Sequence, residues 1–171
     1  MNKETPRYND LSAYLSAHFP YKVQKISLNA GFTCPNRDGT VGYGGCTYCN
    51  NQTFNPAYCK TEKSVTEQLE EGKLFFARKY PDMKFLAYFQ AYTNTYAPLP
   101  YLERVFTDAI MEPEVKVLSI ATRPDCLSSN VLDLLESLNK IKPIWIELGL
   151  QAIHKSTSDF IRRGYELDVF E

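Results

Sequence analysis

Three cysteines lie close together in a glycine-rich stretch of the chain, and thiols are among the side chains that bind metals most strongly. They are Cys34, Cys46 and Cys49, and the last two are separated only by Thr47 and Tyr48. Thiolates are soft ligands that select zinc, copper(I) or iron–sulfur clusters. A cubane iron–sulfur cluster is usually held by four cysteines. Three cysteines would therefore leave one iron open to a small molecule.

A structural zinc site is the alternative interpretation of these thiols. Such a site needs a fourth protein ligand, which Cys59 or a histidine would supply. A zinc ribbon usually carries two Cys-x-x-Cys pairs, whereas this chain has one. Gly44 and Gly45, directly before Cys46, would let the backbone approach a bulky cluster without a Cβ clash. The pattern favours iron–sulfur, with Cys59 and Cys126 as ordinary small residues.

The elements that must position this loop can be predicted from the spacing of apolar residues. Apolar runs predict strands at 22–29, 85–91, 115–121 and 144–150. Helical spacing of apolar residues predicts helices over 11–18 and 131–138 and helices that begin near Pro100 and near Ser156. A capping box at Ser64 predicts a further helix that ends before Pro81. Strands that alternate with helices imply βαβ units and a parallel sheet. The expected fold class is α/β, a partial parallel (β/α) barrel with about four units.

Every unusual polar cluster follows one of these predicted strands. The clusters are the loop from Cys34 to Cys49, which we call the cysteine loop, the segments 90–95 and 122–125, and Gln151. In parallel α/β folds, ligands bind at the carboxyl ends of the strands. We therefore expect the four loops to meet in one binding site.

Composition narrows the class of protein. The chain has 171 residues, 44% of them hydrophobic, which predicts one ordered domain over 1–171. Its formal net charge of −1 gives no overall positive charge for binding nucleic acid. One basic stretch, from Lys60 to Lys84, is interpreted as a solvated helix face. No apolar run approaches the roughly 20 residues that span a bilayer, and the N-terminus lacks a secretory pattern. With clustered thiols, we expect a cytoplasmic protein that makes no membrane contact.

The cysteine loop resembles that of the radical S-adenosylmethionine (SAM) superfamily. There, three cysteines after the first barrel strand hold a [4Fe–4S] cluster, and an aromatic residue precedes the last cysteine, as Tyr48 does here. Three residues commonly separate the first two cysteines in that superfamily, but eleven separate Cys34 from Cys46. That longer gap is similar to a subgroup that includes the Elongator catalytic subunit.

Further motifs resemble the same subgroup. The runs Thr122-Arg-Pro-Asp125 and Glu147-Leu-Gly-Leu-Gln151 are similar to its third- and fourth-strand signatures, followed by Arg163-Gly164. Tyr165 departs from it, because histidine usually follows Arg-Gly. The runs 31–40 and 88–96 resemble stand-alone bacterial proteins of the YhcC/YtqA type. Members of that family are longer, so the chain looks like the N-terminal part of a radical SAM core, without its later strands.

The resemblance also implies which residues contact SAM. The positions that match the segment binding its amino group are Gln90, Thr93, Asn94 and Thr95. Arg123 would bind the carboxylate through charge-assisted hydrogen bonds, with a surface ion pair as the alternative. Glu147 and Gln151 share a face at period two and would point toward the ribose. For Gln90 and Gln151 the alternative is capping of loop amides at strand ends.

The implied activity is radical SAM catalysis. A [4Fe–4S] cluster on Cys34, Cys46 and Cys49 would receive an electron from a flavodoxin- or ferredoxin-type donor, cleave SAM and generate a deoxyadenosyl radical. The likeness to the Elongator catalyst suggests tRNA modification, at a wobble uridine, as the purpose of that radical. The competing hypothesis is a zinc-stabilised binding module without enzymatic activity.

Overall fold

Four strands form a single sheet in which every neighbouring pair is parallel and the spatial order follows the chain. The computed structural model describes residues 7–50, 55–77 and 82–171. The strands are β1 (Val23–Leu28), β2 (Lys84–Phe89), β3 (Val115–Thr122) and β4 (Ile144–Leu148). All four lie within a residue or two of the predicted runs, which confirms the α/β class with a parallel sheet.

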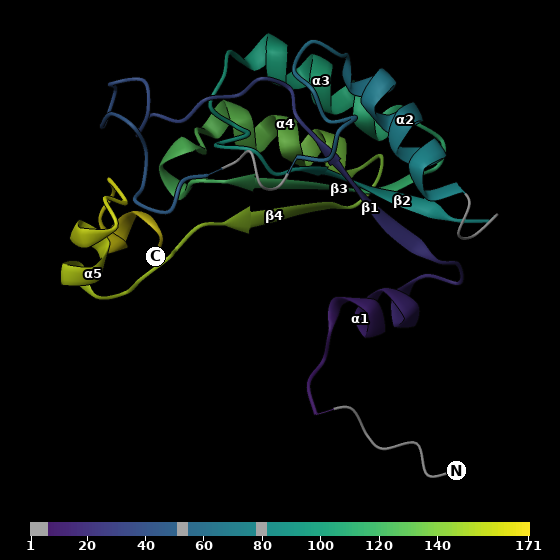
Figure 1. Cartoon of the computed structure of the whole chain (residues 1–171), viewed down its shortest axis with the longest axis horizontal. Coiled ribbons are helices and arrows are strands. Elements are labelled where there is room, and N and C mark those ends of the chain that lie inside the picture. Colours follow the sequence, from purple (N-terminus) through teal and green to yellow (C-terminus); the bar gives the residue numbers. More distant parts are fainter. Residues whose placement is uncertain (1–6, 51–54, 78–81) are drawn as a thin grey trace.

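The helices cover the two faces of this sheet unequally. The α-helices are α1 (Leu11–His18), α2 (Val65–Ala77), α3 (Leu99–Met111), α4 (Ser129–Asn139) and α5 (Lys155–Phe160). Helices α2, α3 and α4 lie together on one face, α1 lies on the other, and α5 lies beyond the end of β4 (Figure 1). Within the described ranges, none of the helices has both the length and the apolarity needed to traverse a lipid bilayer.

Local hydrogen bonds explain where two of these helices begin. Before α2, the backbone N–H of Ser64 donates to the Glu67 carboxylate at 2.7 Å, and the N–H of Glu67 donates to Ser64 Oγ at 3.2 Å. This reciprocal pair is the predicted capping box. At α1, Asp10 Oδ1 accepts from the N–H of Ala13 at 2.7 Å. The predicted end of the second helix before Pro81 falls partly in residues 78–81, outside the described residues.

The main core lies between the sheet and helices α2, α3 and α4. Its fully buried side chains include Ile26 from β1, Leu69 from α2, Phe106 from α3 and Ile120 from β3. Helix α2 approaches β1 closely at Gly72, where an added Cβ would lie 2.6 Å from Ile26 Cγ2. The apolar spacing in the sequence therefore reports the buried faces correctly.

The opposite face of the sheet is only partly covered. A smaller cluster there contains Leu86, Tyr88 and Val117, and Leu15 from α1 packs against it. Strand β4 forms an edge, and Ile146 and Leu148 keep more than a third of their surface exposed. The open face and the edge strand are consistent with a sheet that forms part of a barrel.

Candidate functional site

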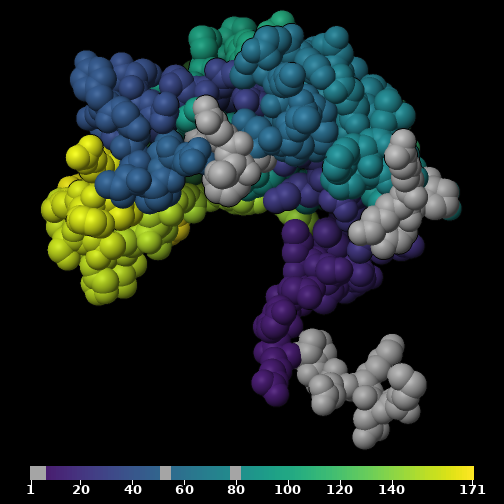
Figure 2. Space-filling view, viewed as in Figure 1, coloured from purple at the N-terminus to yellow at the C-terminus, as the bar shows by residue number. Residues whose placement is uncertain are grey.

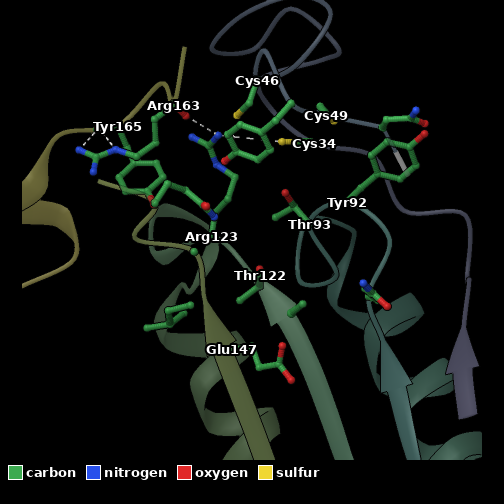
Figure 3. A pocket seen from close by; sticks show the side chains of 17 residues that line it. Cys34, Cys46, Cys49, Tyr92, Thr93, Thr122, Arg123, Glu147, Arg163 and Tyr165 are labelled. Carbon is green, nitrogen blue, oxygen red and sulfur yellow. Dashed lines mark hydrogen bonds between the residues drawn. The ribbon is translucent and has the colours of Figure 1, made fainter. Parts of the chain in front are cut away.

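A cleft of about 460 Å³ lies at the carboxyl ends of the strands, where all four predicted loops meet. Each strand contributes the loop that follows it: Cys34 comes after β1, Thr93 after β2, Arg123 after β3 and Gln151 after β4. Figure 3 shows these loops facing one another above the strand ends. The convergence expected from the sequence is present.

The cysteine loop is folded by its own backbone hydrogen bonds. The carbonyl of Cys34 accepts from the N–H of Arg37 at 2.8 Å, and the N–H of Cys49 donates to the carbonyl of Cys46 at 2.9 Å. Gly45 has a φ of 84°, and a Cβ there would lie 3.1 Å from Cys49 Sγ. Glycine is therefore required at this position both by the backbone conformation and by the adjacent thiol.

An N–H donor approaches the sulfur of each of the three cysteines. Asn36 Nδ2 lies 3.5 Å from Cys46 Sγ, Arg37 Nη1 lies 3.5 Å from Cys49 Sγ, and Arg123 Nη1 lies 4.0 Å from Cys34 Sγ. Cysteine sulfur is a weak hydrogen-bond acceptor, and each of these donors belongs to a different side chain. All three cysteines line the cleft. In the ranges that the structure describes, however, no three His, Cys, Asp or Glu side chains are gathered into a metal-binding group.

Tyr48 lines the cleft next to these thiols with about half of its surface exposed. Partial burial, followed by the negative charge of Cys46, raises the pKa of Tyr48 above its ordinary value. Its phenol therefore stays neutral around pH 7. The aromatic residue that the resemblance places at the cluster thus lines the same cleft as the three cysteines.

The predicted SAM-binding segment after β2 divides into two pairs. Gln90 and Thr93 line the cleft. Asn94 is fully buried, and its Nδ2 donates to the carbonyls of Phe89 at 3.1 Å and Ala121 at 2.7 Å. Thr95 Oγ1 donates to the carbonyl of Cys126 at 2.7 Å and lies 2.6 Å from Thr122 Oγ1. Asn94 and Thr95 thus tie this loop to β3 and do not line the cleft.

Arg123 reaches the cleft, but its donors are occupied by the protein. Its Nε and Nη2 donate to the two oxygens of Asp125 at 2.8 and 2.6 Å, and Nη1 donates to the carbonyl of Arg163 at 2.9 Å. Burial disfavours the charge, yet Asp125 outweighs this and raises the pKa of Arg123 above its usual value. The ion pair considered as the alternative is therefore present, although Arg123 itself is buried.

Glu147 and Gln151 both line the cleft, but not for the reason that the sequence suggested. Strand β4 ends at Leu148, so the period-two alternation does not extend to Gln151. Gln151 instead has a φ of 66°, and its amide lies over Gly149, where an added Cβ would be 2.6 Å from Gln151 Nε2. The Glu147 carboxylate accepts from Tyr88 Oη at 2.7 Å and from Ser119 Oγ at 3.1 Å.

Two further aromatic residues line the cleft, Tyr165, which was not singled out as a ligand contact from the sequence, and Tyr92, which was considered there for stacking on a nucleobase. The Tyr165 ring lies between two guanidinium groups, 4.9 Å from that of Arg123 and 4.4 Å from that of Arg163. Tyr92 has a φ of 66° and carries the guanidinium of Arg37 4.8 Å from its ring centre. The available signals were the Arg-Gly motif before Tyr165 and the position of Tyr92 in the loop after β2. Neither indicates side-chain orientation.

The two other cysteines lie outside this cleft. Cys59 is buried in the main core, where burial raises the pKa of its thiol to about 11. Burial, followed by the charge of Asp125, raises the pKa of Cys126 to about 12. His18 stacks on Tyr14 in α1, and His154 is exposed directly before α5. None of these four side chains lines the cleft, so the fourth ligand that the zinc hypothesis named is not there.

Three lysines of the basic stretch lie next to carboxylates. Lys63 pairs with Glu71 at 2.6 Å, Lys73 with Glu112 at 2.6 Å, and Lys84 lies 3.7 Å from Glu114. Lys63 precedes α2 and Lys84 lies in β2, whereas Lys73 lies in α2 with 13% of its side chain exposed, so the interpretation as a solvated helix face is wrong for these three lysines. Arg78 and Lys79 of the same stretch lie outside the described residues.

Comparison with known proteins finds relatives that match nearly the whole chain. The chain is 41% identical over 164 residues to protein YtqA of Bacillus subtilis, covering 96% of this chain and 51% of that protein. It is 39% identical over 158 residues to protein YhcC of Escherichia coli K12, covering 92% and 50%. Protein MJ0486 of Methanocaldococcus jannaschii is 34% identical over 157 residues, covering 90% and 47%.

The chain spans about half the length of the curated relatives that it matches. No family model matches it. The relatives' names carry no statement about chemistry, so the radical SAM resemblance stays a prediction. What these comparisons show is similarity to YtqA, YhcC and MJ0486 over nine-tenths or more of this chain.

Proposed function

We propose that this chain is part of a radical SAM enzyme whose [4Fe–4S] cluster is held by Cys34, Cys46 and Cys49. One observation carries the proposal. Three cysteines of a single loop line one cleft at the carboxyl ends of a parallel sheet, and an N–H donor approaches each sulfur. Hydrogen bonds to sulfur are among the features that tune iron–sulfur clusters.

The residues of the cleft fit such a group. The donor set contains three thiols, which suits an iron–sulfur cluster with one iron left for another ligand. Zinc would require a fourth protein ligand, and Cys59 is in the core. The backbone at Gly45 passes Cys49 so closely that a side chain there would contact the sulfur. The loop must still draw the three thiols together, which its glycines favour.

When bound, the cluster would supply the single electron that cleaves SAM into methionine and a deoxyadenosyl radical. The chain's own residues bind and orient SAM. Gln90 and Thr93 provide polar groups for its amino acid end, and Glu147 and Gln151 provide hydrogen-bond acceptors for the ribose hydroxyls. The Tyr48 phenol limits access to the cysteines from the mouth of the cleft.

The substrate class follows from the same resemblance and is part of the proposal. We propose RNA, specifically a tRNA wobble uridine, with a flavodoxin- or ferredoxin-type protein as electron donor in the cytoplasm. The paired lysines near α2 offer no broad basic surface. Recognition would therefore be local, with bases stacking on aromatic rings at the cleft such as Tyr92, beside the charge of Arg37.

Anaerobic reconstitution with iron and sulfide tests the proposal directly. We expect about four iron and four sulfide per chain, a loss of both in Cys46→Ala, and formation of deoxyadenosine from SAM under reductant. Cys59→Ala is the matched control, because its thiol is in the core, and it should retain the cluster. Stoichiometric zinc in the purified protein, with no cluster recovered under reductant, would establish the zinc module instead.

A further inference from the structure

Four consecutive backbone carbonyls after α5 accept hydrogen bonds from the cysteine loop or from Arg123. The carbonyl of Ile161 accepts from the N–H of Thr47 at 3.1 Å, and that of Arg162 accepts from Asn36 Nδ2 at 2.5 Å. The carbonyls of Arg163 and Gly164 accept from Arg123 at 2.9 and 3.4 Å. We call residues 161–164 the clasp. Figure 2 shows the yellow C-terminal segment packed against the blue cysteine loop.

The backbone of the clasp is left-handed at two of its four residues. Arg162 has a φ of 56° and Gly164 a φ of 80°. A Cβ on Gly164 would lie 2.9 Å from Val41 Cγ1 and 3.0 Å from Asn36 Oδ1. Arg162 follows α5, and its left-handed conformation ends this helix: the N–H of Arg162 donates to the carbonyl of Asp159 at 3.0 Å, and that of Arg163 donates to the carbonyl of Ser158 at 3.1 Å. These two bonds form a Schellman motif.

Asn36 connects the clasp to a cysteine through one amide group. It is buried, with 5% of its surface exposed. The side-chain Nδ2 of Asn36 contacts both the Arg162 carbonyl and Cys46 Sγ. The backbone carbonyl of Asn36 accepts from the N–H of Gly45 at 2.8 Å. A buried amide with several partners fixes the relative position of those partners.

Arg123 makes the equivalent connection to Cys34. A guanidinium has five N–H donors, and those of Arg123 are directed at both oxygens of Asp125, the carbonyls of Arg163 and Gly164, and Cys34 Sγ. Figure 3 shows this group lying between Arg163 and Cys34. A ligand carboxylate would have to displace bonds that the fold already makes.

From this geometry we infer that Arg123 and Asn36 are positioning residues, which hold the cysteine loop at the cleft by fastening it to the clasp, and that Arg123 does not bind the SAM carboxylate. The inference rests on the proposed function for the identity of the group that the cysteines hold. It reassigns Arg123 from contact with SAM to support of Cys34.

Two variants and one control test the inference. Arg123→Gln removes the bonds to the carbonyls of Arg163 and Gly164. Asn36→Ala removes the side-chain amide that contacts the Arg162 carbonyl, and this variant still tests the inference if Arg123→Gln does not fold. Arg37→Gln is the control, because Arg37 contacts Cys49 Sγ at 3.5 Å and no carbonyl of the clasp. Each protein is compared without and with its cluster.

In the protein without a cluster, the readout is hydrogen exchange of the Thr47 amide, which donates to Ile161. We expect this amide to exchange about tenfold faster in both variants and at the wild-type rate in Arg37→Gln, since one hydrogen bond to a charged or buried partner corresponds to roughly that factor. Wild-type exchange in both variants would overturn the inference. This readout does not depend on the proposed function.

In the cluster-loaded protein, the readouts are iron release to a chelator, the reduction potential and SAM binding. Arg123→Gln should release iron about tenfold faster and shift the potential to more negative values, with an unchanged Kd for SAM. Wild-type iron release with SAM binding weakened tenfold or more would make Arg123 a SAM contact and overturn the inference. If the wild type binds no cluster, the proposed function fails, and the exchange experiment still decides whether the clasp exists.

Discussion

Gln151 combines a left-handed backbone with a side chain that lines the cleft. Its backbone is left-handed, with a φ of 66°, and its exposed amide has no hydrogen-bond partner among the described residues. Tyr92, which also lines the cleft, has the same φ. Strained backbone of this kind concentrates at functional sites. We therefore expect the Gln151 amide to contact a ligand bound in the cleft.

Replacing Gln151 separates its two effects. Gln151→Gly should raise the free energy of unfolding by about 0.5–1 kcal/mol, because glycine adopts a positive φ without a steric penalty. Gln151→Ala should not, since alanine keeps the strain. Both variants should bind SAM about tenfold more weakly, because both lose the amide. Urea unfolding and SAM titration of the cluster-loaded protein measure the two quantities. Wild-type affinity in both variants would show that Gln151 does not contact SAM.

Helix α2 and strand β1 place the cysteine loop through a contact that depends on one glycine. Gly72 faces Ile26, and an added Cβ would lie 2.6 Å from Ile26 Cγ2. Both positions are buried, with Ile26 fully so. The cysteine loop begins a few residues after β1, so a shift of this strand against α2 would be passed on to the loop.

Gly72→Ala should therefore destabilise the protein by about 1–2 kcal/mol. Alanine gains up to about 1 kcal/mol from helix propensity, but overpacking a close-packed core costs about 1–3 kcal/mol. In an Ile26→Ala background the same substitution should be neutral or stabilising, because the space is then free. Thermal or urea unfolding measures the change in the free energy of unfolding in each background. Equal changes in both would show that the contact between Gly72 and Ile26 is not the cause.

At the largest scale, the cleft joins parts of the chain that are far apart in sequence. The carbonyl of Arg162 meets Asn36 across 126 positions, and Arg123 Nη1 meets Cys34 Sγ across 89. A group bound by the cysteines would bind only the folded chain, so its binding free energy adds to folding stability.

Cluster loading should accordingly raise the melting temperature. At a hundredfold excess over Kd the gain is about 2.7 kcal/mol, which for a chain of this size corresponds to roughly 5–10 °C. Scanning calorimetry before and after anaerobic reconstitution measures it. Removal of iron by a chelator should reverse the increase. Cys46→Ala treated in the same way should show no increase, and an equal increase there would place the bound metal elsewhere.

Periodicity and composition were sufficient for the order and type of the elements and for the loops that meet at the cleft. Runs such as Phe85–Ala91 indicate buried strands because apolar burial is what forms them, and the capping box at Ser64 acts through neighbours only three residues apart. The cysteines were recognisable because thiol chemistry belongs to the residue type.

The tertiary structure alone decided which polar side chains face the cleft and which hold it together. Asn94 and Thr95 look like Gln90 and Thr93 in the sequence, yet their side chains bond to β3 and do not line the cleft. Arg123 looks available for a ligand, yet carbonyls some forty positions later occupy its donors. Local spacing encodes the face on which a side chain lies, whereas its hydrogen-bond partners are chosen only when distant segments meet.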